Sequence, residues 1–318
     1  MEQFIYSDRF FSRAKLMLTG EYMVLHGAKA LSLPLKLGQT MDVRVSEGIS
    51  SLQWKTLEKG RTWFEAHYSL PEFAIGNTND FQVAKNLRDI LVAARKLNPG
   101  FLTEGRHYMV STNLQFDFRW GLGSSSSLIA NISSWADVDP FMLNTMVSEG
   151  SGYDIATSLS ESPIIYSLSK EGPKTRKVPF DPVFKDKLYF VYTGEKRITD
   201  EAVKEFRQKD KDFSAEIADI NAITESLLMT NNLIEFTGLL AQHEQIIGDI
   251  LGETTIKKKR FFDFNGFVKS LGAWGGDFVL FASDYPVEYV TSYLKRKNLN
   301  TWFYYRDIVG PVNSVANV

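Results

Sequence analysis

Hydrophobic and polar residues alternate along the first third of the chain in a pattern typical of β-strands. Residues 41–45 alternate apolar and polar side chains, which predicts a strand with one buried face. Residues 52–55 and 62–68 lie on either side of a Glu-Lys-Gly turn, which predicts a hairpin. Residues 108–112 predict a further strand, which leads toward a glycine-rich segment.

Three segments with a helical pattern interrupt this strand-rich part of the chain. The first helix is predicted from a cap at Asn79 or Asp80 to Leu97, with one apolar face that consists of Phe81, Ala84, Leu87, Ile90, Leu91 and Ala94. A second helix is predicted over residues 128–135. A third begins at an Asp-Pro pair, residues 139–140, because Asp is a favoured cap and Pro fits the first helical position.

The second half of the chain is richer in helices. Strands are predicted over residues 187–192, 278–282 and 302–305, and helices over residues 199–209, 214–230, 233–251 and 287–297. A strand-rich half followed by a helix-rich half is an α+β pattern, because the strands and helices do not alternate regularly. The change in composition near residues 172–187 predicts two domains, residues 1–180 and 181–318.

Charge and composition argue against several classes of partner. The 36 Lys and Arg residues nearly balance the 38 Asp and Glu residues, so no strong field favours nucleic acid or an anionic membrane. The chain has no cysteine, which excludes a thiolate nucleophile, and its four histidines lack the spacing of a zinc site. No apolar run approaches the roughly 18 residues of a membrane helix, and the N-terminus lacks the pattern of a signal peptide. We therefore expect a soluble cytoplasmic protein without nucleic-acid or membrane partners.

A glycine- and serine-rich segment, residues 121–127, is the strongest candidate for chemistry. Gly121 and Gly123 let the backbone approach a ligand without interference from a Cβ atom. Four consecutive serines and an apolar, helix-compatible run follow. A helix that begins there would direct free N–H groups and the positive end of its dipole toward the loop, an arrangement that binds phosphate. A surface turn is the alternative for this segment taken alone.

Three other segments combine glycines with charged side chains. In residues 15–27, an apolar run lies between a lysine and a glutamate, and a buried edge strand with a turn is the alternative. In residues 149–156, two glycines place Asp154 on a tight turn, where a carboxylate can accept a proton from a substrate hydroxyl; a helix cap is the alternative. In residues 269–277, three glycines would allow two loops to pack closely, with a helix C-cap as the alternative.

The order of these segments resembles that of the GHMP kinases, a family named for galactokinase, homoserine kinase, mevalonate kinase and phosphomevalonate kinase. The resemblance extends from about Lys15 to Asp277, and it is greatest to the mevalonate and phosphomevalonate kinase branch. It implies a two-domain α+β fold. The N-terminal half would be similar to the second domain of ribosomal protein S5, and the C-terminal half would be ferredoxin-like.

The resemblance also implies roles for individual residues. The residues that would bind the phosphates of ATP are Gly121, Leu122, Gly123, Ser124, Ser125 and Ser126. Ser125 would in addition bind Mg²⁺. Asp154 would take the proton from the substrate hydroxyl, and Lys15 would pair with Asp154 and keep it ionised. The supporting positions would be Glu21, Gly152, Gly275 and Gly276.

The function implied by the resemblance is an ATP- and Mg²⁺-dependent kinase that acts on a small anionic metabolite, with mevalonate or phosphomevalonate as the leading substrate. A sugar or sugar-phosphate kinase is one alternative, and a ligand-binding relative without catalysis is another. A homodimer is compatible with the sequence. The chain departs from the family pattern at Ala14, Asp117 and Trp274, where Gly, Pro and Gly are usual. The sequence assigns no carboxylate ligand for Mg²⁺, and Glu149 is named only as a candidate.

Overall fold

The computed structural model describes residues 4–194, 206, 211–272 and 277–310. By their contacts these residues form two compact units, each assembled from separate stretches of the chain. The first unit is drawn from residues 1–14, 37–118 and 122–159, and the second from residues 15–36, 119–121 and 160–318. This division differs from the predicted boundary at residue 180, because two long strands, β1 (Tyr6–Met17) and β2 (Ala30–Glu47), each contribute to both units.

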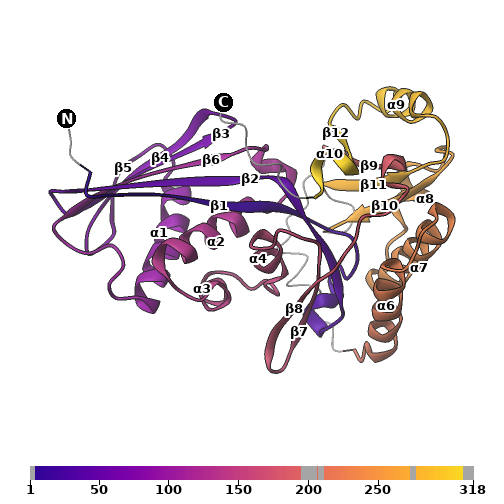
Figure 1. Cartoon of the computed structure of the whole chain (residues 1–318), viewed down its shortest axis with the longest axis horizontal. Helices are drawn as coiled ribbons and strands as arrows, with labels where there is room; N and C mark the ends of the chain where they lie inside the picture. Colours follow the sequence, from indigo (N-terminus) through magenta and orange to yellow (C-terminus); the bar gives the residue numbers. More distant parts are fainter. Residues whose placement is uncertain (1–3, 195–205, 207–210, 273–276, 311–318) are drawn as a thin grey trace. The chain divides into compact units, whose positions relative to one another are not determined.

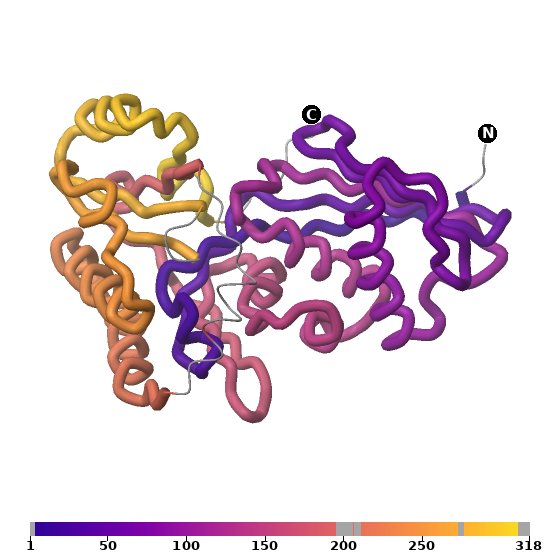
Figure 2. Tube along the Cα trace, turned by 180° about the vertical axis from the view of Figure 1, so that it is seen from behind, coloured from indigo at the N-terminus to yellow at the C-terminus, as the bar shows by residue number. Residues whose placement is uncertain are grey.

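The first unit is a twisted sheet with helices on one face. Its further strands are β3 (Ser51–Glu58), β4 (Arg61–Ser69), β5 (Ala74–Thr78) and β6 (Arg106–Leu114). Its helices are α1 (Phe81–Leu97), α2 (Ser124–Ala136), α3 (Pro140–Val147) and α4 (Tyr153–Ser158). The strand order is β5-β4-β3-β6-β2, with β1 paired to β2. Of the pairs β2–β6, β3–β4, β3–β6 and β4–β5, β3–β6 is parallel and the other three are antiparallel. All four helices lie on the same face of the sheet in both views (Figures 1 and 2).

The elements predicted for this unit are confirmed, and local signals explain where they begin. The Asp80 side chain accepts hydrogen bonds from the Gln82 and Val83 amides and so caps α1. The apolar face of α1 packs into a core that includes Trp54 and Tyr68 of the predicted hairpin. The Asp139 side chain likewise accepts from the Met142 amide at 2.8 Å at the start of α3. Caps of this kind are typically worth about 1 kcal/mol each.

The second unit contains a four-stranded antiparallel sheet. The strands of this sheet are, in order across it, β10 (Phe267–Leu271), β11 (Phe278–Ala282), β9 (Leu188–Tyr192) and β12 (Trp302–Tyr304). Its helices are α6 (Ser214–Leu227), α7 (Leu233–Leu251), α8 (Ile256–Arg260), α9 (Val287–Arg296) and α10 (Tyr305–Ile308). The unit also has a hairpin, β7 (Ile164–Ser169) and β8 (Gly172–Lys177), and β7 pairs with the beginning of β2.

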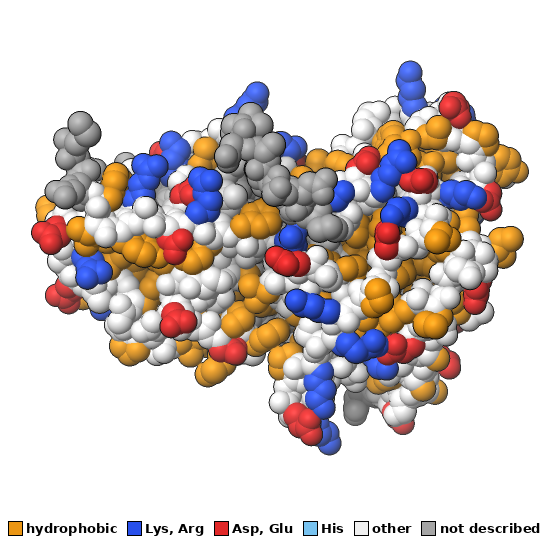
Figure 3. All heavy atoms as spheres, in the orientation of Figure 1, with side chains coloured by type: hydrophobic (Ala, Val, Ile, Leu, Met, Phe, Trp, Pro, Cys, Tyr) orange, Lys and Arg blue, Asp and Glu red, His pale blue; other side chains and the backbone are white. Residues whose placement is uncertain are grey.

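The last glycine segment differs from its prediction. Residues 267–271 form the buried strand β10, so the beginning of the segment over residues 269–277 is neither a loop nor a helix C-cap. The first glycine of this segment follows directly after Leu271. The predicted helix over residues 199–209, together with Trp274, Gly275 and Gly276, lies outside the described residues, Phe206 excepted. No helix among the described residues is long and apolar enough to cross a membrane. On the face drawn in Figure 3, acidic and basic side chains are interspersed.

Candidate active site

The predicted phosphate loop ends at the beginning of helix α2. Gly121 and Gly123 both have left-handed backbone conformations, with φ of 66° and 89°, which glycine adopts with little strain. The Leu122 side chain between them is 1% exposed, so it anchors the loop while both glycines present their backbone. Gly123 is the N-cap residue of α2, and no side chain caps this end of the helix.

The beginning of α2 has the features of an anion-binding site. The first intrahelical hydrogen bond runs from the Ser127 amide to the Gly123 carbonyl at 3.0 Å. The amides of Ser124, Ser125 and Ser126 therefore have no acceptor within the helix. The first turn carries no acidic side chain, so nothing on this helix offsets the positive end of its dipole. Because α2 has 13 residues, its dipole is well developed at this end.

The serine hydroxyls of this loop differ in what they contact. The Ser126 hydroxyl donates to the Gly123 carbonyl at 3.0 Å, and the Ser127 hydroxyl donates to Gln39 Oε1 at 2.9 Å. These two side chains are buried and stabilise the turn. Ser126 can therefore offer a ligand its backbone amide but not its hydroxyl. Ser125 is exposed and Ser124 is half-buried. Ser125 is therefore the better placed of the predicted residues to offer a hydroxyl to a phosphate or a cation.

Asp154 lies in the first turn of α4, a short helix that packs against α2 within the first unit. Gly152 is the N-cap residue of this helix, with φ of 87°, so this conformation requires the predicted glycine. Asp154 is half-buried and follows the cap by two positions, so it is not itself the cap. The structure therefore places the helix of the predicted base beside the helix of the predicted phosphate loop.

Lys15 lies in β1, in the part of the chain that belongs to the second unit, and its side chain is half-buried. The preceding residue, Ala14, is fully buried, and it occupies the position where the family usually has glycine. Because Lys15 and Asp154 belong to different units, their ion pair remains a prediction.

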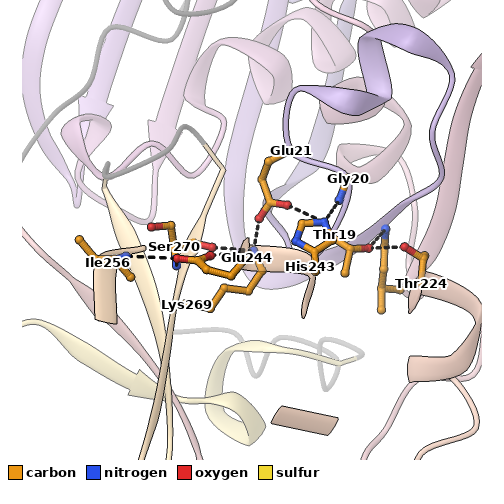
Figure 4. A network of polar contacts seen from close by, with 10 residues as sticks. Thr19, Gly20, Glu21, Thr224, His243, Glu244, Ile256, Lys269 and Ser270 are labelled. Atoms are coloured by element: carbon orange, nitrogen blue, oxygen red, sulfur yellow. Dashed lines mark hydrogen bonds and ion pairs between the residues drawn. The ribbon is translucent and has the colours of Figure 1, made fainter. Parts of the chain in front are cut away.

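A buried polar cluster holds the turn that follows β1 (Figure 4). Glu21 is 3% exposed, and it pairs with Lys269 of β10, which is 1% exposed. A second carboxylate, Glu244 of α7, lies 3.8 Å from Lys269 Nζ. The Gly20 amide donates to Nε2 of the fully buried His243, also of α7, at 2.9 Å. The supporting position Glu21 is thus part of an electrostatic cluster built from three separate segments of the second unit.

The hydrogen bonds of this cluster indicate where its protons are. Because His243 Nε2 accepts from the Gly20 amide, the ring proton is on Nδ1. Burial and the charge of Lys269 hold the pKa of His243 well below its usual value, so the ring is neutral. Its 3.3 Å approach to Glu21 Oε2 is therefore not an ion pair. Burial also raises the pKa of Glu21 to about 7 and raises that of Glu244. One Lys269 cation thus faces two carboxyl groups that compete for it, a situation in which one of them keeps a proton.

This cluster should make the stability of the protein depend on pH. Between 4.5, the ordinary glutamate pKa, and about 7, folded Glu21 holds a proton that the unfolded chain releases. The free energy of unfolding should therefore fall as pH rises through this window, by up to roughly 3 kcal/mol. Glu21→Gln mimics the protonated acid, so denaturant titrations at pH 5 and pH 8 should show a smaller decrease for this variant. The exposed Glu171→Gln serves as the control, and an equal decrease in all three proteins would contradict the assignment.

Sequence reasoning missed three members of this cluster as site residues. Lys269 stood in the last glycine segment but received no role, and Glu244 appeared only as part of a helix. His243 was considered only as one of four histidines that lack the spacing of a zinc site. A His-Glu pair on the apolar face of α7 was the available signal, because charged residues seldom face a core without a partner.

Comparisons with solved structures identify the fold. Mevalonate kinase from Methanococcus jannaschii matches with a TM-score of 0.69 and 18% identity, over 94% of this chain and 98% of that chain. Phosphomevalonate kinase from Streptococcus pneumoniae, in complex with phosphomevalonate and AMPPNP, matches with a TM-score of 0.67 and 14% identity, over 93% and 99%. Galactokinase from Lactococcus lactis, in complex with galactose, matches with a TM-score of 0.64 and 13% identity, over 96% and 94%.

The class of fold is therefore mixed α+β, as predicted, and the structure has a large and a small sheet. More particularly, the chain has the fold of the GHMP kinases over nearly its whole length. No protein-family model matches the sequence, and no curated protein matches it in sequence. The short glycine segments thus indicated the fold, although the identity of this chain to these solved structures is only 12–18%.

Proposed function

We propose that this protein is an ATP-dependent kinase that transfers the γ-phosphoryl group of ATP to a small anionic metabolite. The observation that carries the proposal is the beginning of α2, where three amides without helical acceptors follow two left-handed glycines. Such an arrangement binds phosphate. The fold supports the proposal, since the structural relatives include mevalonate kinase, phosphomevalonate kinase and galactokinase. Fold alone does not establish an activity, so the proposal depends on the site.

Mg²⁺ fits the side chains present at this loop. Mg²⁺ takes oxygen ligands and is usually held by one or two protein groups together with substrate phosphates. The exposed Ser125 hydroxyl offers such a ligand in the first turn of α2. Among the described residues there is no group of three or more His, Asp or Glu side chains that could hold a metal by themselves. A cation that arrives with ATP is consistent with this donor set, and when bound it would reduce the negative charge of the phosphates.

Asp154 would serve as the general base for a hydroxyl acceptor. Its side chain lies in the first turn of α4, and a carboxylate placed within hydrogen-bond reach of a substrate hydroxyl can accept the proton of that hydroxyl. The predicted charge of Lys15 would hold this carboxylate in place. Positioning and electrostatics supply most of the rate in phosphoryl transfer, and the base contributes the remainder.

The acceptor is the part of the proposal that most needs an experiment. Mevalonate and phosphomevalonate are the leading acceptors, since kinases named for these two substrates share the fold. A sugar or sugar phosphate is the alternative, since galactokinase shares it too. ATP turnover with a panel of these acceptors would discriminate between them, and no turnover with any acceptor would favour a ligand-binding protein without catalysis. A homodimer and a cytoplasmic location remain predictions.

Replacement of Ser125 by Ala should lower Mg²⁺-dependent turnover with little change in folding. Loss of a group that positions a bound metal typically costs roughly 10–100-fold in metal affinity or activity. Ser134→Ala, the same change at the exposed far end of α2, is the matched control and should leave turnover unchanged. Steady-state kinetics as a function of Mg²⁺ concentration would measure the effect. Kinetics equal to those of the wild-type protein would remove Ser125 from the site.

A further inference from the structure

The second unit contains a cavity of about 620 Å³ between helix α7 and strand β10. Both α7 and α8 pack against β10, which is an edge strand of the small sheet (Figure 1). The lining includes Ile234 and Gly238 of α7, Val268 of β10, and Tyr285 in the turn after β11. Small-molecule sites typically measure about 300–1,000 Å³, so this cavity has the size of such a site.

Val268 presents its backbone to this cavity. The Ser283 amide donates to the Lys187 carbonyl, so alternate residues of β11, among them Phe281, direct their backbone groups toward β9. Val268 is opposite Phe281, and its N–H and C=O therefore point away from β11, toward the free edge of the sheet. Within the described part of the chain, no group forms a hydrogen bond with this amide or this carbonyl. The Val268 side chain packs in the core with α9, so the backbone is the part of Val268 that lines the cavity.

The free edge at this place is short. The next amide that faces outward, that of Ser270, donates to Glu244 Oε1 at 3.3 Å, and the Ile256 amide donates to the same oxygen at 3.4 Å. The buried Glu244 carboxyl thus closes the edge on one side of Val268, and β10 begins at Phe267 on the other side. A peptide that adds a strand to a sheet needs a longer row of backbone groups. This edge therefore suits a small molecule rather than a polypeptide.

Gly238 gives the cavity space at a cost to the helix that carries it. Glycine in the interior of a helix is destabilising relative to alanine. Gly238 lies inside the 19-residue helix α7, its φ is not left-handed, and a Cβ atom built on it would contact no neighbouring element within 4 Å. Neither the backbone conformation nor the packing thus requires a glycine here. Because Gly238 lines the cavity, its missing side chain leaves room for a ligand.

Two large apolar side chains are exposed at the same cavity. Ile234 is 79% exposed and Tyr285 is 53% exposed. The Tyr285 ring packs against the Tyr289 ring at 5.0 Å between centres, which holds its orientation. Such sites combine apolar walls with a few polar groups that fix the orientation of the ligand. An apolar ring could therefore cover these side chains while its polar edge meets the backbone of Val268.

We propose that this cavity is an accessory binding site for a planar heteroaromatic molecule that carries an amino group next to a ring nitrogen. The Val268 N–H would donate to the ring nitrogen, and the Val268 C=O would accept from the amino group, as the adjacent acceptor and donor of an adenine edge are read in other complexes. The ring would occupy the space beside Gly238. This inference does not depend on the proposed kinase activity, because none of the residues that line the cavity has a role in the transfer reaction.

The test measures binding of two probes to the full chain by calorimetry at millimolar concentration. The first probe is aminoquinoxaline with its amino group next to a ring nitrogen, and the second is its dimethylamino analogue, which lacks the N–H donor. The wild-type protein should bind the first probe about tenfold more tightly, the worth of one hydrogen bond. Gly238→Leu should weaken binding of the first probe at least about tenfold, because the new side chain fills the cavity. Gly238→Ala should raise Tm by about 1–4 °C, since no contact requires the glycine.

Gln242→Leu is the matched control, because Gln242 is exposed on the same helix and does not line the cavity. This variant should bind the first probe as the wild-type protein does. Ile234→Ser, which removes an exposed apolar wall, should weaken binding and decides the matter if Gly238→Leu does not fold. Equal binding of the first probe by the wild-type protein and the cavity variants would overturn the inference, and so would a wild-type protein that binds neither probe. Equal affinity of the two probes would overturn the role of the Val268 backbone.

Discussion

Replacement of Asp154 by Asn should abolish most of the phosphoryl transfer to a hydroxyl acceptor while the protein folds and binds ATP. The amide has the size of the carboxylate but cannot take a proton, and general base catalysis typically contributes about 10²–10⁴-fold. Turnover should therefore fall by about this factor. Asp154 is half-buried in the first turn of α4, so the loss of its favourable interaction with the helix dipole should cost only about 0.3–1 kcal/mol.

The same substitution at Asp139 is the control for this experiment. Asp139 caps α3 in the same unit, and Asn is as good an N-cap as Asp, so Asp139→Asn should leave both stability and turnover unchanged. Turnover should be measured together with the affinity for ATP, which neither variant should change. Full activity of Asp154→Asn toward a hydroxyl acceptor would show that Asp154 is not the base.

The size of the loss also reports on the acceptor. A hydroxyl must lose its proton during transfer, whereas a phosphate oxygen is already ionised near neutral pH and needs little help from a base. A large effect of Asp154→Asn would therefore favour a hydroxyl acceptor such as that of mevalonate. A small effect, with turnover of phosphomevalonate, would favour transfer to a phosphate.

Replacement of Lys269 by Met should strongly destabilise the folded protein. Lys269 is 1% exposed and is the cation for Glu21 and Glu244 in the buried cluster. Removing one partner of a buried ion pair typically costs about 3–5 kcal/mol, because the remaining charge stays buried without compensation. The cost should be smaller at pH 5 than at pH 8, since burial raises the pKa of Glu21 to about 7 and this acid is therefore protonated, and carries no charge, at pH 5.

Urea unfolding of the Lys269→Met variant would measure this cost against two references. Lys259→Met removes an exposed lysine that lies 3.6 Å from Glu253, and such surface pairs are worth at most about 1 kcal/mol. The double variant Lys269→Met, Glu21→Gln should recover part of the loss, because it also removes a buried charge. If Lys269→Met were as stable as Lys259→Met at pH 8, the cluster would not be held by this ion pair.

The local structure of the chain was largely predictable from its sequence. The hairpin of β3 and β4, helix α1 with its Asp80 cap, and the beginning of α3 at Asp139 were all expected, because each depends on residues within a few positions of one another. The helix after the glycine-serine loop was expected for the same reason. The order of the glycine segments also indicated the fold, and Gly121, Gly123 and Gly152 have the left-handed backbone that glycine adopts with little strain.

The electrostatics of the site could not be predicted in this way. Glu21 and Lys269 are 248 positions apart, and nothing near either residue in the sequence indicates that the two meet in the core. The proton kept by the cluster follows from desolvation, which depends on everything packed around a group. Sequence thus specified where strands, helices and turns form, through short-range steric and hydrogen-bonding preferences, whereas burial and long-range packing set the charges that these elements meet.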